Sequence, residues 1–359
     1  MQTTDQYQPS LSDKLWEWLG ISNRPMLKLY NGYGHSTQLL IMGHMLKRSP
    51  LPPKHYRKNI LSNTLALLRL FMVKPFSGVE LRMHWEGQEL TTVSDKEGFF
   101  RFDWKDQPPL PQGWNEITVE AFHRGNRIAV ATGEVYVPFD TQFGFISDID
   151  DTFLISHSAN LRKRLFVLFT QNARSRQPFD GSALHYQLLA QGNTTADAPN
   201  PFFYVSSSEW NLYDYLVEFT KTHSLPRGVF LLNVLKQFNE LLKTGQSHHQ
   251  TKFSRIVRIL ETYPHQRFVL LGDNSQMDPE IYASIAKHYP RRIQAVYIRN
   301  IRPANETKAN GFLATIAERG ITTCLFTHSQ EAIAHSRNIG LITTSEHVHY
   351  TESSHRNTG

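Results

Sequence analysis

Three aspartates lie close together behind an apolar run in FGFISDIDDTFLIS, residues 143 to 156. The run has the composition of a buried β-strand, and Asp148 and Asp150 stand at its end. Residues i and i+2 of an extended segment point the same way, so these two carboxylates can converge on one point. Without a cation, such a pair would force one carboxyl group to bind a proton. A Mg²⁺ ion, which prefers oxygen ligands and retains several waters, removes that conflict.

Other polar residues follow apolar runs farther along the chain. Ser206 follows FFYV, and Asp273 and Asp278 lie in GDNSQMD, directly behind RFVLL. Lys252 opens the helical segment that precedes this last run. Carboxylates suit a metal ion, whereas a hydroxyl and an ammonium group can donate to the oxygens of a phosphoryl group. The set therefore predicts metal-assisted phosphoryl chemistry.

The elements that must position these residues form an α/β pattern after Pro138. Continuous apolar runs of strand length alternate with helical segments such as KFSRIVRILETYP and PEIYASIAKHYP. The runs are GFISDID, FFYVSSS, GVFLLN, RFVLLGDN, IQAVYIRN and TTCLFT. Apolar strands without alternation, interleaved with helices, predict a parallel sheet covered on both faces. Ligands of such sheets bind beyond the carboxyl ends of the strands, which is where the polar residues fall.

The preceding part of the chain has a period of two. From about residue 28 to 140, short β-type segments such as GVELRMHW and NEITVEAF are bounded by Gly, Pro, Asp and Asn. This pattern predicts an antiparallel β-sandwich. It is interrupted by PPKHYRKNILSNTLALLRLFM, for which we predict a helical insertion, and a short helix is expected from Ser12 to Gly20.

These patterns predict two domains with short flanking segments, which agrees with a length of 359 residues. The predicted units are a tail with a short helix at residues 1–28, a β-sandwich at 29–140, an α/β domain at 141–345 and a flexible tail at 346–359.

Composition limits the class of protein. A net charge of +6 tilts long-range attraction toward anionic partners, and the single cysteine, Cys324, excludes an intramolecular disulfide and a cysteine-rich zinc site. The amino terminus lacks the pattern of a secretory signal, and the apolar stretch from Ile60 to Val73 is shorter than the roughly 20 residues of a membrane span. We therefore expect a cytoplasmic protein, with peripheral membrane contact as an option.

Each candidate residue has an alternative interpretation. DIDDT could cap a helix, or it could begin a calcium loop at Asp148, but such a loop requires Gly and Glu where this chain has Phe153 and Ala159. Asp273 could also be a helix cap. Ser206 is followed by two further serines, and a hydroxyl at a strand end is commonly a cap.

The lysine has competitors of its own. Lys252 competes with Lys243 and with Arg255, since solvated basic residues are common on helices. Its position at the start of the helical segment before the last acidic strand end favours Lys252.

Together these residues resemble the motifs of the haloacid dehalogenase superfamily of phosphotransferases. The matches are Asp148, Asp150 and Thr152 to D-x-D-x-T, Ser206 to the serine or threonine that ends a strand, Lys252 to the lysine, and Asp273 and Asp278 to the second acidic motif. The resemblance implies a Rossmann-like parallel sheet. The short stretch between the first two motifs implies little cap, and therefore an open site.

A closer resemblance is to the catalytic domain of the Mg²⁺-dependent phosphatidate phosphatases of the actin patch protein type. ISDIDDT, RSRQPFDG, FFYVSSSEWNLYDYL, LPRGVFLLN and FVLLGDNSQMDPEIY are similar to the signatures of that family, over about residues 143 to 300. One departure is Glu209, which stands where we expect proline in many relatives. The resemblance implies hydrolysis of phosphatidate to diacylglycerol and phosphate.

It also implies a role for each matched residue. Asp148 would attack phosphorus to form an aspartyl-phosphate, and Asp150 would act as general acid and then general base. Mg²⁺ would be held by the carboxylates of Asp148 and Asp273 and by the backbone carbonyl of Asp150. Supporting roles fall to Asp278 beside the metal, Thr152 in the loop, and Ser206 and Lys252 on the phosphoryl oxygens.

Other functions remain open from the sequence. The substrate could be a soluble or macromolecular phosphomonoester, although the lack of interleaved basic and aromatic stripes disfavours nucleic acid. Alternatively, the sandwich could be the working part, as an adaptor for protein or membrane. Basic residues that could contact lipid phosphates are Arg162, Lys163, Arg164, Arg174 and Arg176. The acyl-chain preference and the oligomeric state are not predicted.

Overall fold

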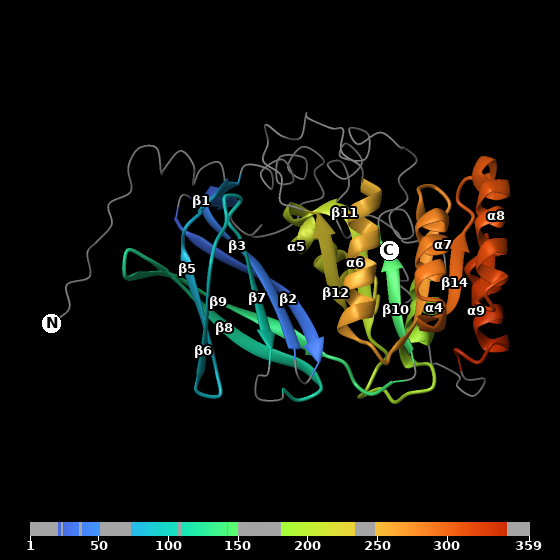
Figure 1. Ribbon diagram of the computed structural model, residues 1–359, viewed down its shortest axis with the longest axis horizontal. Helices are drawn as coiled ribbons and strands as arrows, with labels where there is room; N and C mark the ends of the chain where they lie inside the picture. The colour runs from blue at the N-terminus through green and yellow to red at the C-terminus, as the bar shows by residue number, and fades with distance from the viewer. Residues whose placement is uncertain are drawn as a thin grey trace, which may run out of the picture.

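The structure is a computed structural model of the chain that describes residues 21–22, 24–35, 38–50, 73–105, 110–141, 143–149, 181–233 and 248–342. Two sheets lie side by side, an amino-terminal sheet of nine strands and a carboxyl-terminal sheet of six (Figure 1). The helix expected at Ser12–Gly20, the helical insertion before Val73 and the tail at 346–359 fall outside the described residues.

The nine-stranded sheet follows the period-two segments of the sequence. Its strands are β1 (Ile21–Ser22), β2 (Met26–His35), β3 (Gln38–Pro50), β4 (Lys74–Pro75), β5 (Glu80–Trp85), β6 (Gln88–Val93), β7 (Phe99–Lys105), β8 (Gly113–His123) and β9 (Asn126–Val137). In β7 the alternation is plain, because Phe100, Phe102 and Trp104 are buried while the residues between them are exposed.

The strand pairing of this sheet is mixed. The main order is β1-β3-β2-β9-β8-β5-β6, and both β4 and β7 pair with β3. All of these pairs are antiparallel except β2 with β9, which run parallel. The antiparallel pairing of the predicted β-sandwich is therefore confirmed for most pairs and wrong for this one, and the described strands connect into one nine-stranded sheet rather than two separate sheets. Alternation within a strand reports which face is buried, and it carries no information about the direction of the neighbouring strand.

The six-stranded sheet is parallel throughout, as the sequence predicts. Its strands are β10 (Phe143–Asp148), β11 (Phe202–Glu209), β12 (Val229–Asn233), β13 (Arg267–Asp273), β14 (Ile293–Arg299) and β15 (Thr322–Phe326), in the order β12-β11-β10-β13-β14-β15. Every residue of β10 is buried, which explains the apolar run without alternation.

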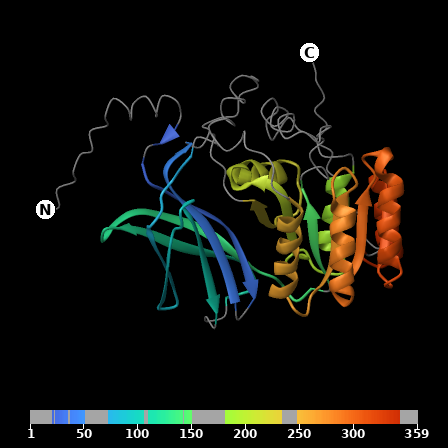
Figure 2. The same ribbon diagram turned by 45° about the horizontal axis from the view of Figure 1, so that its top comes forward.

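Helices cover both faces of this sheet. They are α4 (Ser182–Gln191), α5 (Tyr213–Thr222), α6 (His248–Thr262), α7 (Asp278–His288), α8 (Glu306–Ala317) and α9 (Ser329–Asn338), with a short 3₁₀ turn η1 (Trp210–Leu212) before α5. Helices α6, α7 and α8 pack in a row on one face, and α4 contacts α9 on the other (Figure 2). The chain moves outward from β10 in both directions, to β11 and β12 on one side and to β14 and β15 beyond β13 on the other. This reversal makes the carboxyl end of β10 the expected ligand crevice.

The two sheets meet through aromatic side chains. Tyr30 of β2 stacks on Trp210 of η1, with ring centroids 4.0 Å apart, and also contacts Tyr213 of α5. At the same junction the ammonium group of Lys28 lies 2.8 Å from a carboxylate oxygen of Asp214. Because Trp210 directly follows β11, the amino-terminal sheet supports the element that carries Ser206.

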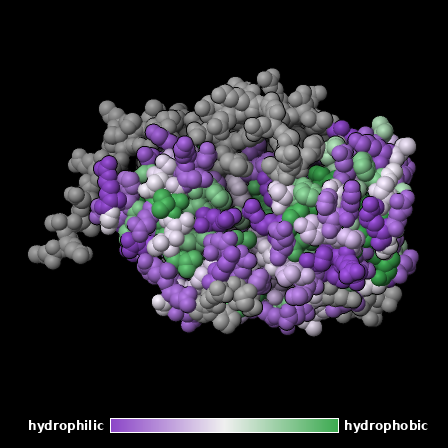
Figure 3. Space-filling model, in the orientation of Figure 1, coloured by the Kyte–Doolittle hydropathy of each residue, from purple (hydrophilic) through white to green (hydrophobic). Residues whose placement is uncertain are grey.

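The surface shown in Figure 3 is largely hydrophilic, with apolar residues gathered over part of the nine-stranded sheet. Among the described residues, no helix has the length and apolar character to cross a membrane.

Candidate active site

Three carboxylates from separate elements meet at the carboxyl edge of the parallel sheet. Asp148 ends β10 and Asp273 ends β13, and these strands are neighbours, with Ser147 of β10 opposite Leu271 of β13. Asp278 begins α7. The three side chains each offer an oxygen within 4.8 Å of the others, and all three residues are buried. The predicted convergence of Asp148, Asp273 and Asp278 is thus present.

A glycine allows Asp278 to approach the end of β13. A Cβ atom added at Gly272 would lie 2.5 Å from Oδ2 of Asp278, closer than a real Cβ contact. The same oxygen accepts the backbone N–H of Asp273 at 3.3 Å, and Oδ1 of Asp273 accepts the backbone N–H of Ser275 at 2.6 Å. The GDNSQMD segment therefore folds back so that both of its acids face one point.

Lys252 lies within this cluster, whereas Arg255 does not. Its ammonium nitrogen is 2.8 Å from Oδ1 of Asp148 and donates to Oδ1 of Asp278. Arg255, one helical turn farther along α6, donates instead to the backbone carbonyl of Ser206 and to Oδ1 of Asn233. The third contender, Lys243, falls outside the described residues.

Within the part of the chain that the structure describes, the cluster brings three carboxylates together, and the ammonium group of Lys252 pairs with two of them. The pKa of Asp278 is raised to about 6, because desolvation by burial and the nearby Asp273 together outweigh the lowering effect of Lys252. A buried site with excess negative charge favours either a proton or a metal cation. The ligands on offer are all carboxylate oxygens, the donors that Mg²⁺ prefers, so the residues fit the predicted ion.

Ser206 ends the apolar part of β11 at the same edge of the sheet. Asp148 pairs in register with Val205, so Ser206 lies one residue beyond the level of Asp148. Its side chain is buried, and its Oγ accepts the backbone N–H of Ser208 at 2.9 Å. Asn233 and Arg255 hold the same strand end through the carbonyls of Ser207 and Ser206. The hydroxyl therefore has the predicted position and also the local capping contact of the alternative interpretation.

Several predicted residues lie outside the part of the chain that the structure describes. Asp150 and Thr152 fall outside the described residues, as do the basic residues between positions 162 and 176. The roles of Asp150 as acid, base and metal ligand stay predictions.

Asn274 is a residue of this edge that the sequence analysis missed. Its Oδ1 accepts the backbone N–H groups of Ile301 and Arg302, each at 2.8 Å, and its Nδ2 donates to the carbonyl of Arg302 at 2.9 Å. These bonds tie the loop after β13 to the loop after β14. Asn274 stands beside Asp273 in GDNSQMD, so its proximity to an expected metal ligand was a usable signal.

Arg299 is a second residue that the sequence analysis missed. It ends β14 opposite Asp273, and its side chain is buried while donating to the hydroxyls of Ser182 and Ser329 at 2.9 and 2.7 Å. Desolvation lowers the pKa of this guanidinium, and Tyr186 and Asp273 raise it. The signal for Arg299 was the same as for Ser206, namely a polar residue at the end of an apolar run.

Comparisons with known proteins point to the same segment. Residues 143–300 match the family model described as "Phosphatidate phosphatase APP1, catalytic domain". The chain is 32% identical over 157 residues to Phosphatidate phosphatase APP1 of Saccharomyces cerevisiae, which covers 44% of this chain and 25% of that protein. It is 24% identical over 220 residues to an uncharacterised protein of Schizosaccharomyces pombe, which covers 59% of this chain and 35% of that protein.

Solved structures give weaker likenesses. A carbohydrate acetylesterase from Xanthomonas citri aligns with a TM-score of 0.30 at 10% identity, covering 88% of this chain and 75% of that one, and at this score it supports no inference. This chain spans 25% and 35% of the lengths of the two curated relatives. The match to the catalytic-domain family covers all three clustered carboxylates and Lys252. Residues 143–300 therefore match the APP1 catalytic domain, which confirms the closer of the two resemblances predicted from the sequence, that to the actin patch protein type.

Proposed function

We propose that this chain is a Mg²⁺-dependent phosphatidate phosphatase that hydrolyses phosphatidate to diacylglycerol and phosphate through an aspartyl-phosphate on Asp148. The observation that supports this most is the cluster of three buried carboxylates with Lys252, at the carboxyl edge of a parallel sheet and inside the segment that matches the APP1 catalytic domain. The arrangement agrees with a haloacid dehalogenase type of domain.

Asp148 has the surroundings of a nucleophile. Lys252 lies 2.8 Å from its Oδ1, and an adjacent ammonium group favours the ionised carboxylate. An ionised carboxylate can attack phosphorus and displace the diacylglycerol alkoxide, so that one difficult hydrolysis becomes two easier steps. Water then attacks the phosphorus of the aspartyl-phosphate, which releases phosphate and restores Asp148.

The proton transfers require a second acid. Asp150, two residues beyond Asp148, would donate a proton to the leaving alkoxide and would later accept one from the attacking water. Lys252 and Ser206 would hold the phosphoryl oxygens, and such fixed donors stabilise charge best in a site that excludes water. Thr152 would orient the loop that carries Asp150.

The carboxylates of Asp148 and Asp273 would hold Mg²⁺ together with the Asp150 carbonyl, with Asp278 in support. When bound, the ion would neutralise charge that develops on the phosphoryl oxygens. Lys252 already contacts both Asp148 and Asp278, so this residue also keeps the acidic side chains together.

Phosphatidate lies in a bilayer, so the site must reach a membrane surface. We propose a cytoplasmic protein that contacts anionic membranes peripherally, with its open carboxyl edge toward the headgroups. The basic residues between positions 162 and 176 are the candidates for this contact, each contributing about 1 kcal/mol near an anionic surface.

The test is phosphate release from vesicles of phosphatidylcholine with a minor fraction of phosphatidate, with Mg²⁺ and then with excess EDTA. Unaltered protein should release phosphate only with Mg²⁺, and Asp148→Asn should release none. The matched control is Asp140→Asn, an exposed aspartate outside the cluster, which should behave like the unaltered protein. Activity confined to soluble esters such as p-nitrophenyl phosphate would reject the lipid substrate, and full activity of Asp148→Asn would reject the mechanism.

A further inference from the structure

A cavity of about 520 Å³ lies at the end of the six-stranded sheet opposite the carboxylates. Its lining includes the residues that directly precede β11 and β12, the carboxyl-terminal part of α4, and Trp114 and Tyr136 of the amino-terminal sheet. The carboxylates of Asp148 and Asp273, in contrast, lie at the carboxyl ends of β10 and β13. This size and this position at the junction of two sheets are typical of ligand sites.

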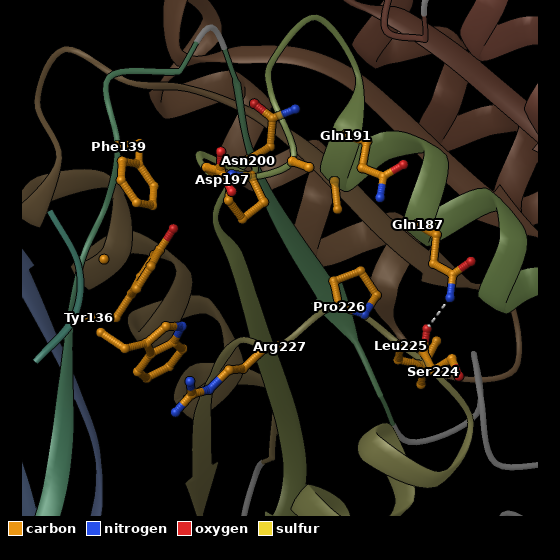
Figure 4. A pocket seen from close by; sticks show the side chains of 15 residues that line it. Tyr136, Phe139, Gln187, Gln191, Asp197, Asn200, Ser224, Leu225, Pro226 and Arg227 are labelled. Atoms are coloured by element: carbon orange, nitrogen blue, oxygen red, sulfur yellow. Dashed lines mark hydrogen bonds between the residues drawn. The ribbon is translucent and has the colours of Figure 1, made fainter. Parts of the chain in front are cut away.

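One wall of the cavity is aromatic. Tyr136 and Phe139 lie on one side in Figure 4, with Gln187, Gln191 and Pro226 on the other. The rings of Trp114 and Tyr136 pack against each other with centroids 4.8 Å apart, so this wall is continuous across β8 and β9. Such a wall can pack against the apolar rings of a ligand.

Two charged side chains, those of Arg227 and Asp197, line the cavity. The guanidinium of Arg227 lies 4.0 Å from the ring centre of Trp114 and pairs with the carboxylate of Glu134, so its charge is compensated. Asp197 also lines the cavity, and among the described residues no lysine or arginine forms an ion pair with it. Charge complementarity thus favours a cationic or neutral ligand over a phosphate or an acidic headgroup.

We propose that this cavity binds a proline-rich peptide segment of another protein that carries a basic residue. A polyproline II helix is extended before it binds, and its rings dock into aromatic-lined grooves while its carbonyls remain free to accept hydrogen bonds. The aromatic wall would take the proline rings, and the hydroxyl of Tyr136 and the amide of Gln191 would donate to the carbonyls. Asp197 would pair with the basic residue.

The test is isothermal titration of the full chain with a synthetic peptide of proline pairs separated by leucine, with arginine at its amino end. A second peptide replaces every proline with alanine, and a third replaces the arginine with glutamine. We expect saturable binding of the first peptide, much weaker binding of the alanine peptide, and binding of the glutamine peptide reduced by up to about fivefold, the effect of one exposed ion pair.

Two variants locate the binding. Phe139→Ala should lower the affinity for the first peptide about tenfold, which corresponds to about 1.4 kcal/mol of binding free energy. Asp197→Asn changes an exposed residue and leaves the apolar wall intact. This variant should bind the arginine peptide only as tightly as unaltered protein binds the glutamine peptide. Its affinity for the glutamine peptide should equal that of unaltered protein. Asp140→Asn and the catalytic variant Asp148→Asn should bind like unaltered protein, and both cavity variants should retain phosphate release.

Four outcomes would overturn the proposal. The first is a titration with the first peptide that gives no saturable binding isotherm, and the second is an affinity for the alanine peptide equal to that for the first peptide. The third is an unchanged affinity of both cavity variants for the first peptide, and the fourth is displacement of the bound peptide by simple sugars or nucleosides. The last outcome would assign the cavity to a different class of ligand.

Discussion

The ammonium nitrogen of Lys252 lies 2.8 Å from Oδ1 of Asp148, and the two side chains are 3% and 0% exposed. The same ammonium group donates to Asp278. One buried cation therefore connects the proposed nucleophile, at the end of β10, with the acid that begins α7. Since a buried charge is costly without partners, the three side chains depend on one another.

Lys252→Met should abolish most activity and also destabilise the metal-free protein. Removing one partner of a buried pair leaves an uncompensated charge, which typically costs about 3 to 5 kcal/mol, and loss of a fixed donor to the phosphoryl group should lower kcat by about 100-fold or more. Urea unfolding in EDTA and vesicle assays with Mg²⁺ measure the two effects. Lys308→Met, which removes an exposed pair with Glu280, should cost less than about 1 kcal/mol and leave kcat unchanged.

Mg²⁺ should stabilise the unaltered protein against unfolding, by about 2.7 kcal/mol at a hundredfold excess over its dissociation constant. Asp273→Asn should remove this effect because it removes a proposed ligand. Without Mg²⁺, the same variant should be at least as stable as unaltered protein, because one of three mutually repelling carboxylates is gone. Thermal unfolding with Mg²⁺ and with EDTA measures both effects. If Mg²⁺ stabilised Asp273→Asn as much as it stabilises unaltered protein, Asp273 would be excluded as a ligand.

Gly272→Ala should lower Mg²⁺-dependent activity by displacing the start of α7. Its new Cβ would lie 2.5 Å from Oδ2 of Asp278, so the carboxylate must move away from Asp148 and Asp273. The control is Gly311→Ala in α8, where the added Cβ would meet nothing within 4 Å apart from the helix's own backbone and the adjacent residues, and it should stabilise the protein by about 0.5 to 1 kcal/mol. A Gly272→Ala enzyme with unaltered Mg²⁺ affinity and kcat would contradict the close approach.

Two buried histidines should make the protein sensitive to mild acid. Desolvation lowers the pKa of His44 and of His185 from 6.5 to about 3, with Lys28 and Arg299 respectively as the next causes. The unfolded chain therefore binds these protons first, so the stabilisation is complete above about pH 6.5 and decreases as the pH falls toward 3.

The loss should approach about 1.4 kcal/mol per pH unit for each histidine. Urea unfolding at several pH values below 6.5 measures the slope, which His185→Gln should reduce. An equal slope in unaltered protein and His185→Gln would contradict a neutral, buried His185.

The sequence by itself determined the parallel sheet and the three acidic positions now found together. Apolar runs without alternation require burial on both faces, and the carboxyl ends of parallel strands share one edge, so the sequence predicts that Asp148 and Asp273 meet. The position of Lys252, at the start of the helical segment before the last acidic strand end, favours it over its competitors in the same way.

Only the tertiary structure decided which neighbours each side chain contacts. The parallel pairing of β2 with β9, the contact of Tyr30 with Trp210, and the bonds of Asn274 and Arg299 join residues far apart in the chain. A local pattern reports the burial of a residue and not the identity of its partner. For this reason the cavity beside Tyr136 and Pro226, built from both sheets, has no signature in either stretch of sequence.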